Sequence, residues 1–179
     1  MAGNARFAAR TPAIRDTAEI DAIWSGGIGQ NQAPFATVLG CADSRLAPEI
    51  IFDQFVGNIF VVREAGNIAD SPTNLGSLEF GQAVLGSKII VVLGHSDCGA
   101  VKAAFDNAAP GGNIESIIAA IRPGIAGAVD LDEAVDRNVG AVIERMRRDS
   151  PMLAAAEKAG AVTIVGAVYD IESASVRLL

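Results

Sequence analysis

The distribution of apolar residues predicts alternating strands and helices. Short, almost unbroken apolar runs occupy residues 36–40, 58–63, 88–93 and 161–169. Continuous runs of this length are typical of strands that are buried on both faces of a parallel sheet. Between them, apolar residues recur at helical spacing, most clearly over residues 130–148. The pattern therefore predicts an α/β fold with a central four- to five-stranded, mostly parallel sheet flanked by helices.

Capping residues predict where several of the helices begin. Ser71 and Ser150 each precede a proline, which is tolerated in the first turn of a helix. The two helices are expected to end near Leu85 and Lys158. The sequence predicts a helix followed by a loop over residues 113–128. It also predicts an additional edge strand in the tail that ends at Leu179.

The length of 179 residues predicts a single domain over residues 1–179. Residues 1–30 read as one or two short helices with a glycine-rich break at residues 26–29. We expect this helical arm to pack on a partner subunit. Its candidate apolar stripe consists of Ala8, Ile14, Ile20, Ile23 and Trp24.

Composition excludes some classes of partner. The formal net charge of −7 argues against nucleic acid, because binding to the phosphate backbone depends on clustered Lys and Arg. No apolar run approaches the roughly 18 residues that a membrane helix requires, so no membrane partner is expected. The two cysteines, without an apolar signal-peptide core, suit a reducing compartment. The expected location is the cytoplasm.

The single histidine and both cysteines of the chain lie at the ends of two predicted strands. Cys41 follows the run 36–40, and His95 and Cys98 follow the run that ends at Gly94. In doubly wound sheets, sites form beyond the carboxyl ends of strands where the winding reverses, so these side chains are expected to meet there. Two thiolates and one imidazole favour zinc, and three protein ligands leave a fourth position for water or substrate. The sequence therefore predicts a catalytic zinc site.

Asp43 and Arg45 lie two and four residues after Cys41, within reach of the same cavity. A carboxylate this close to zinc could occupy the fourth position and block it. A charge-assisted hydrogen bond to Arg45 would instead hold Asp43 off the metal, where it could accept a proton from water. We therefore expect both residues to be catalytic, with Asp43 as a pH-dependent gate.

Three motifs of the chain resemble the β-class carbonic anhydrase family. They are Cys-Ala-Asp-Ser-Arg at 41–45, Arg-Glu-Ala-Gly-Asn at 63–67 and Gly-His-Ser-Asp-Cys-Gly-Ala at 94–100. The resemblance is strong over residues 30–105 and looser over residues 160–170. It implies a zinc lyase that interconverts carbon dioxide and bicarbonate through zinc-bound hydroxide, assembled as a homodimer or a dimer-based oligomer. Carbonic anhydrase is itself the general example in which zinc lowers the pKa of bound water to about 7.

The resemblance also implies roles for individual residues. It assigns the zinc to Cys41, His95 and Cys98 and the catalytic pair to Asp43 and Arg45. Gln32 matches a glutamine that in this family reaches bicarbonate across the dimer interface. The residues that match the apolar carbon dioxide pocket, or lie next to it, are Phe60, Ala65, Gly66 and Phe80.

One position departs from a branch of this family that carries a second, non-catalytic bicarbonate site. That branch has a Trp three residues before the first cysteine ligand, together with an Arg and a Tyr. Here the Trp position is Val38, although Arg63 and Tyr169 match the other two. We therefore expect no inhibitory bicarbonate site. Because His95 is the single histidine, no other imidazole can carry protons to solvent, and turnover should depend on buffer concentration.

Three alternatives remain open from the sequence. The same fold and zinc site support hydrolysis of carbonyl sulfide or carbon disulfide in related enzymes. A different class of protein would be a metal-free redox switch, in which Cys41 and Cys98 form a disulfide. The third alternative is a zinc-bearing scaffold protein that has lost activity.

Overall fold

The computed structural model describes residues 1–13, 17–27 and 31–179 and places five strands in one sheet. The strands are β1 (Ala36–Gly40), β2 (Ile59–Arg63), β3 (Ile89–His95), β4 (Thr163–Tyr169) and β5 (Val176–Leu178). The helices of the described residues are α1 (Ala2–Ala8), α2 (Thr17–Ser25), α3 (Pro48–Ile51), α4 (Pro72–Glu79), α5 (Gly99–Phe105), α6 (Ile114–Ile121), α7 (Leu131–Asp149) and α8 (Pro151–Lys158). A 3₁₀ turn spans Ala65–Asn67, and a π-helical turn at Phe80–Val84 continues α4.

The predicted α/β architecture is confirmed. The strand order is β2-β1-β3-β4-β5, with β1 parallel to both β2 and β3, and β3 parallel to β4. The tail forms the expected edge strand, which runs antiparallel to β4. The chain passes from β1 to β2 on one side and then crosses to β3 on the other. The winding therefore reverses between β1 and β3, which is where ligands bind in sheets of this kind.

The third strand is longer than the apolar pattern predicts. The expected strand ends at Leu93, whereas β3 continues to His95. The reason is its neighbour, because β4 offers two further partners in register, with Gly94 beside Val168 and His95 beside Tyr169. The Ser96 amide then donates a hydrogen bond to the Tyr169 carbonyl at 2.9 Å. His95 is consequently held on the sheet rather than on a loop beyond it.

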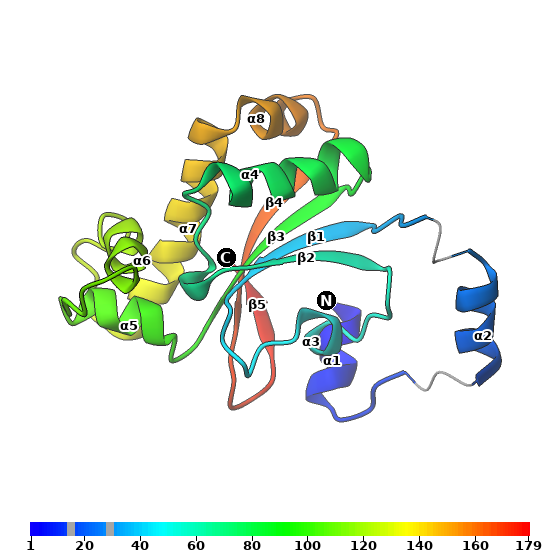
Figure 1. Cartoon of the computed structure of the whole chain (residues 1–179). Coiled ribbons are helices and arrows are strands. Elements are labelled where there is room, and N and C mark those ends of the chain that lie inside the picture. The colour runs from blue at the N-terminus through cyan, green and yellow to red at the C-terminus, as the bar shows by residue number, and fades with distance from the viewer. Residues whose placement is uncertain (14–16, 28–30) are drawn as a thin grey trace.

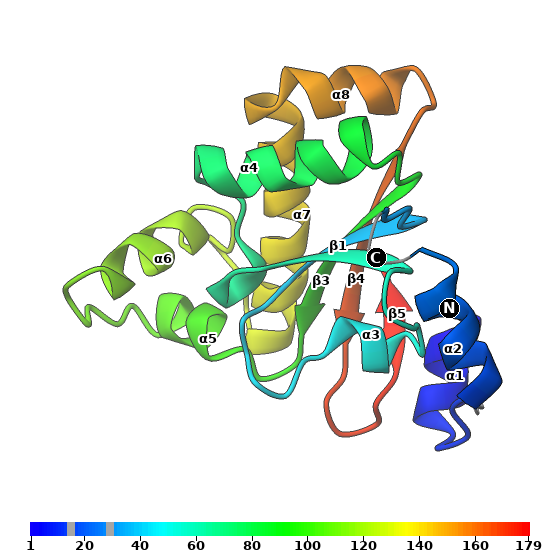
Figure 2. The same cartoon turned by 45° about the vertical axis from the view of Figure 1, so that its right-hand side comes forward.

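Three helices, α4, α7 and α8, cover one face of the sheet, as Figures 1 and 2 show. The long helix α7 packs closely on β3 and β4 because Gly94 and Gly166 have no side chains. A Cβ at Gly94 would lie 2.6 Å from a methyl carbon of Val139, and one at Gly166 would lie 2.9 Å from the other methyl. Helices α5 and α6 extend this layer beyond the carboxyl ends of the strands (Figure 1).

Of the described helices, α1 and α3 lie against the opposite face (Figure 2). The side chain of Asn4, in α1, makes three hydrogen bonds to the backbone of the same subunit. Its Nδ2 donates to the carbonyls of Ile51 and Ala174 at 3.2 and 3.0 Å, and its Oδ1 accepts from the Val176 amide at 2.7 Å. The first part of the predicted arm therefore packs on its own subunit. The rest of this sheet face is lined mainly by apolar side chains, among them Val38, Ile89 and Val91, and is called the open face below.

Helix α2 stands away from the sheet in Figure 1. Trp24, in the predicted apolar stripe of the arm, is 56% exposed. Ile14 of the stripe and residues 28–29 of the glycine-rich break lie outside the described residues. Among the residues that the structure describes, no helix is both long and apolar enough to cross a membrane.

Candidate metal centre

The structure brings together Cys41, His95 and Cys98. Their sulfur atoms and one ring nitrogen lie within 4.8 Å of one another, and all three residues are buried. Cys41 directly follows β1, His95 is the last residue of β3, and Cys98 precedes the first turn of α5. The cluster therefore lies at the switch point between β1 and β3, where the sequence predicts it.

The imidazole of His95 is oriented for coordination. Its Nδ1 lies 2.9 Å from the carbonyl oxygen of Ser96, so Nδ1 carries the proton and Nε2 presents a lone pair. Nε2 is fully buried and has no hydrogen-bond partner within the described part of the chain. Buried polar atoms are rarely left without a partner. A metal ion between the imidazole and the two sulfurs would satisfy this nitrogen.

The two cysteines interact strongly and neither forms a disulfide. The hydrogen bond between their side chains lowers the pKa of Cys41, against the opposing effect of burial. The same hydrogen bond, together with burial, raises the pKa of Cys98. A divalent cation between the two sulfurs would favour the thiolate form of both.

Backbone amides surround the Cys41 sulfur. The amide of Gly66 donates to it at 3.2 Å, and the amide of Asp43 donates at 3.4 Å. Gly66 has a left-handed backbone with φ of 72°, and a Cβ there would lie 2.7 Å from a side-chain carbon of Ile121. The backbone angle therefore favours glycine at this position, and a larger residue would also have to displace the end of the Ile121 side chain.

The donor set fits zinc. Two thiolates with one imidazole are ligands that zinc accepts in tetrahedral sites, and three protein ligands leave one position open. The hydrogen bond from His95 Nδ1 to a carbonyl, and those from amides to the Cys41 sulfur, are outer contacts typical of built metal sites. Cys41, His95 and Cys98 could thus hold a zinc ion.

Asp43 is held beside the cluster by Arg45. Its Oδ1 accepts from the Arg45 Nε at 2.9 Å, and its Oδ2 accepts from Nη2 at 2.7 Å. The Arg45 amide also donates to Oδ1, at 2.9 Å. These hydrogen bonds keep the pKa of Asp43 well below its usual range. Asp43 Oδ2 lies 4.0 Å from His95 Nε2, so an ionised carboxylate faces the space that a metal would occupy.

Arg63 fastens the loop that carries Cys41. Its Nε donates to the Cys41 carbonyl at 3.0 Å, and its Nη2 donates to the Asp43 carbonyl at 2.6 Å. In this structure the Arg63 guanidinium therefore hydrogen-bonds to the backbone of this loop.

Val38, at the position where one branch of the family has a Trp, is 1% exposed and lines the open face of the sheet.

The residues predicted to bind substrate divide into two groups. Gly66 contacts Cys41 as described, and Ala65 precedes it in the same turn. Phe60 is in register with Thr37, four residues before Cys41, which is roughly 13 Å along a strand. Its ring packs against Phe80, with the centroids 6.2 Å apart. The structure therefore does not bring these two rings to the cluster of the same chain.

Gln32 is exposed and lies before the amino end of β1. Cys41 follows the other end of that strand, so Gln32 is also remote from the cluster of its own chain. Its action across a subunit interface stays a prediction.

Two further residues at the site were not singled out by the sequence. Asp97 has φ of 51° and contacts Arg45 through its carbonyl and its carboxylate. Asn138 of α7 donates to the Gly66 carbonyl at 2.9 Å. The single cue for Asn138 is a polar residue on the apolar face of a predicted helix.

Comparisons with known proteins agree with this geometry. A family model described as "Carbonic anhydrase" matches residues 36–176. The carbonic anhydrase of Mycolicibacterium smegmatis is 38% identical over 185 residues, covering 98% of this chain and 88% of the relative. The chain belongs to the β-class carbonic anhydrase family. The range matched by the family model includes Cys41, His95 and Cys98. Membership of this family supports hydration of carbon dioxide as the activity.

Solved structures of the family share this fold. A Coccomyxa β-carbonic anhydrase, solved in complex with acetazolamide, has a TM-score of 0.78 at 30% identity, covering 90% of this chain and 79% of its own. One of two tetrameric β-carbonic anhydrases from Sordaria macrospora has a TM-score of 0.79 at 23% identity, covering 90% and 88%. The sheet and its helices are thus those of the family.

Proposed function

We propose that this chain hydrates carbon dioxide reversibly at a zinc ion held by Cys41, His95 and Cys98. One observation carries the proposal: the ligand atoms of the three residues converge within 4.8 Å, and the buried His95 Nε2 has no hydrogen-bond partner among the described residues. When bound, zinc supplies a Lewis acid that makes hydroxide available at neutral pH.

The protein contributes a fixed base beside the metal position. Asp43 is held ionised by its two-point contact with Arg45, and its Oδ2 faces His95 Nε2 at 4.0 Å. While Arg45 holds the carboxylate, Asp43 stays off the metal and can accept a proton from the attacking water. This arrangement would leave one coordination position for water or substrate. The Ala65–Gly66 turn lies beside the Cys41 sulfur, to which the Gly66 amide donates.

The protons released by hydration must reach solvent without a second histidine to carry them. His95 is the single histidine, and it is fully buried. Buffer or exposed carboxylates therefore carry the protons to solvent. Turnover at saturating carbon dioxide should rise with the concentration of imidazole buffer, and a rate independent of buffer over a wide range would contradict this part of the proposal.

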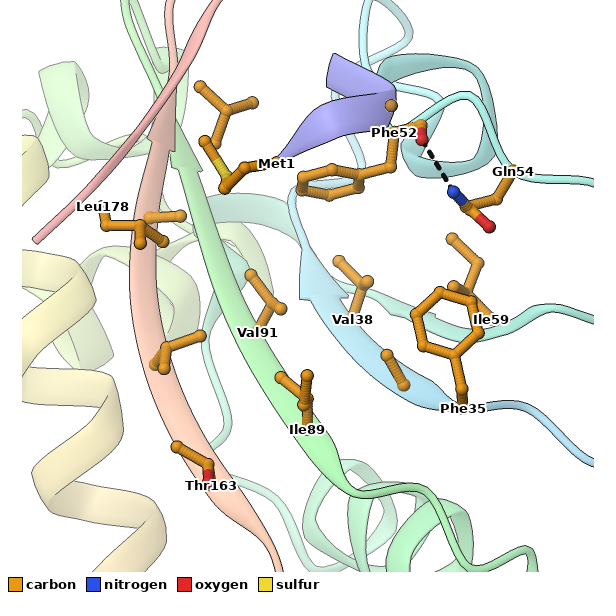
Figure 3. Close-up of a pocket in the computed structure, with 15 residues that line it drawn as sticks. Met1, Phe35, Val38, Phe52, Gln54, Ile59, Ile89, Val91, Thr163 and Leu178 are labelled. Carbon is orange, nitrogen blue, oxygen red and sulfur yellow. Dashed lines mark hydrogen bonds between the residues drawn. The ribbon is translucent and has the colours of Figure 1, made fainter. Parts of the chain in front are cut away.

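The active form is proposed to be a homodimer or an assembly of dimers. The open face of the sheet forms a hollow of about 360 Å³, shown in Figure 3, with Phe35, Ile89 and Leu178 around it. These three side chains are 52%, 39% and 57% exposed. A second copy of the chain would remove this apolar surface from water. Gln32, which is exposed and remote from its own cluster, would then be available to the partner. Phe60 and Phe80 lie on the α4 side of the sheet, opposite this hollow, and their predicted contact with substrate is not explained by docking at this face.

The assembly has a direct test. Ile89→Glu places a charge on the open face and should convert the protein to a monomer in light scattering. The substitution Ile114→Glu, on an exposed isoleucine of α6, is the matched control and should leave the assembly unchanged. A wild-type protein that is monomeric at working concentration would refute the dimer without affecting the zinc proposal.

We also propose that the protein works in a reducing compartment such as the cytoplasm. Cys41 and Cys98 are both free thiols, and oxidation of either would remove a candidate ligand.

The main experiment combines metal analysis with a hydration assay. Protein purified under reducing conditions should contain about one zinc per chain and should hydrate carbon dioxide in a stopped-flow assay across pH. Cys98→Ser should lose most of both the metal and the activity. Zinc-free wild-type protein with a redox-dependent thiol count would favour the disulfide switch instead. Zinc-loaded protein without activity would favour the scaffold.

Carbonyl sulfide and carbon disulfide are the alternative substrates. The same zinc-loaded preparation should be assayed with each of them and with carbon dioxide. A kcat/KM for carbon dioxide well above the other two is the expected result.

A further inference from the structure

Asn138 is a buried amide on a helix face that is otherwise apolar. It is 2% exposed, and its neighbours on the inner face of α7 include Ala134, Val135, Val139 and Val142, all buried. A polar side chain in such surroundings costs stability unless it is hydrogen-bonded, and an apolar residue of similar size would pack there without that cost. Core packing alone therefore does not account for an asparagine at this position.

The partner of Asn138 lies in the turn that contacts the candidate metal centre. Its Nδ2 donates to the carbonyl oxygen of Gly66 at 2.9 Å, across 72 residues of sequence. The amide of that same glycine donates to the Cys41 sulfur at 3.2 Å. One residue thus links the helix to the sulfur, with its carbonyl turned towards α7 and its N–H towards Cys41.

The turn needs an external anchor because its backbone is unusual. Gly66 and Asn67 are successive residues with positive φ, at 72° and 46°. The turn has one internal backbone hydrogen bond, from the Asn67 amide to the Glu64 carbonyl at 2.8 Å. The N–H that contacts the sulfur belongs to the peptide between Ala65 and Gly66, and the carbonyl that accepts from Asn138 belongs to the next peptide, between Gly66 and Asn67. By holding that second peptide, Asn138 fixes the position of the Gly66 Cα from which the N–H extends.

We propose that Asn138 is a positioning residue for the metal centre, which holds the Gly66 turn so that its amide stays hydrogen-bonded to the Cys41 thiolate. This inference rests on the proposed zinc site. An N–H donor on a ligating sulfur withdraws electron density from it and so tunes how strongly the sulfur donates to the metal. Outer contacts of this kind commonly change metal affinity or activity by about 10- to 100-fold when they are removed.

The test uses cobalt(II) as the metal, because thiolate-to-cobalt charge transfer reports directly on the sulfur. Wild-type protein, Asn138→Leu and Asn138→Asp are loaded with cobalt(II), and their absorption spectra are compared. The leucine is close to asparagine in size but has no donor. The aspartate has no donor once it is ionised, so the spectra are recorded at a pH high enough to ionise it. We expect the charge-transfer band to shift in both variants. We also expect a chelator to remove the cobalt about 10-fold faster than from wild type.

Val142→Ala is the matched control on the same face of α7. Val142 is buried, so this substitution should lower thermal stability without changing the band or the rate of cobalt release. If the Asn138 variants are destabilised but keep the wild-type spectrum and release rate, Asn138 is only a packing residue and the inference is wrong.

Two further outcomes keep the inference separate from the proposed function. If Asn138→Leu does not fold, the decision rests on Asn138→Asp and on cadmium-substituted wild-type protein. In the latter, scalar coupling between the Gly66 amide proton and cadmium would support the hydrogen bond to the ligating sulfur, and its absence would refute it. If wild-type protein binds cobalt without a thiolate charge-transfer band, the proposed metal centre fails and this inference fails with it.

Discussion

Arg45 and Asp97 join the two loops that carry the candidate metal ligands. The Nη2 of Arg45 donates to the Asp97 carbonyl at 3.2 Å, and its Nη1 lies 3.5 Å from the Asp97 carboxylate. The same guanidinium holds Asp43 on its other edge. Asp97 therefore supports the position of the proposed base from the opposite loop, through its backbone and through its charge.

The backbone of Asp97 should matter more than its charge. Asn tolerates the left-handed conformation that Asp97 adopts, with φ of 51°, whereas a β-branched residue does not. Asp97→Asn should therefore keep kcat/KM within a few-fold of wild type. Asp97→Val should lower it by about 10-fold or more, because small displacements of a catalytic group are costly. Equal losses in the two variants would show that the carboxylate, rather than the carbonyl, is the important contact.

Arg45→Lys should separate charge from geometry at the proposed base. Lysine keeps the positive charge but cannot make the two-point contact with a carboxylate. We expect kcat/KM to fall by about 100-fold, within the range for a misplaced general base, while the zinc content stays unchanged. Arg137→Lys, at an arginine that pairs with Glu133 on the surface of α7, is the control and should have no effect. Undiminished hydration by Arg45→Lys would remove Arg45 from the mechanism.

The close packing of α7 on the sheet predicts a compensating pair of substitutions. In Gly94→Ala the new methyl would lie 2.6 Å from a side-chain carbon of Val139, so the free energy of unfolding should fall by about 1–3 kcal/mol. Val139→Ala in the same protein removes the clashing methyls and should recover part of the loss. Chemical denaturation of the four proteins in a double-mutant cycle measures this coupling. A Gly94→Ala protein as stable as wild type would contradict the packing described for this face.

An ion pair between α7 and α8 predicts a dependence of stability on pH. Arg147 contacts both carboxylate oxygens of Glu157 at 2.8 Å, and this contact lowers the pKa of Glu157. A lowered pKa in the folded state stabilises the protein above the ordinary glutamate value of about 4.3, and that stabilisation is lost as the pH falls further. The pair is partly exposed, so its contribution should be at most about 1 kcal/mol.

The measurement is the difference in thermal stability between wild type and Glu157→Gln as a function of pH. The difference should be constant near pH 7 and should shrink below about pH 4.3 as the wild-type carboxylate is protonated. Glu144 also contacts Arg147 but is 70% exposed, so Glu144→Gln should show a smaller difference. A difference that grows as the pH falls would have the wrong sign for this ion pair.

The sequence by itself determined the order and type of the elements and the residues of the candidate metal centre. Strands covered by helices leave continuous apolar runs, and helices leave apolar residues at regular spacing, so both can be recognised locally. Cys41, His95 and Cys98 could be grouped because parallel strands deliver the residues that follow them to one edge of the sheet. Asp43 and Arg45 could be paired because they lie two residues apart.

Only the tertiary structure decided the contacts that join distant parts of the chain. The extension of β3 to His95 depends on the length of β4. The hydrogen bond from Asn138 to Gly66 spans 72 residues, and it leaves no periodic pattern that could be read beforehand. The separation of Phe60 and Gln32 from the cluster follows from the register and direction of β1 and β2. Such relationships arise when elements pack against one another, so they are properties of the folded arrangement and not of any one segment.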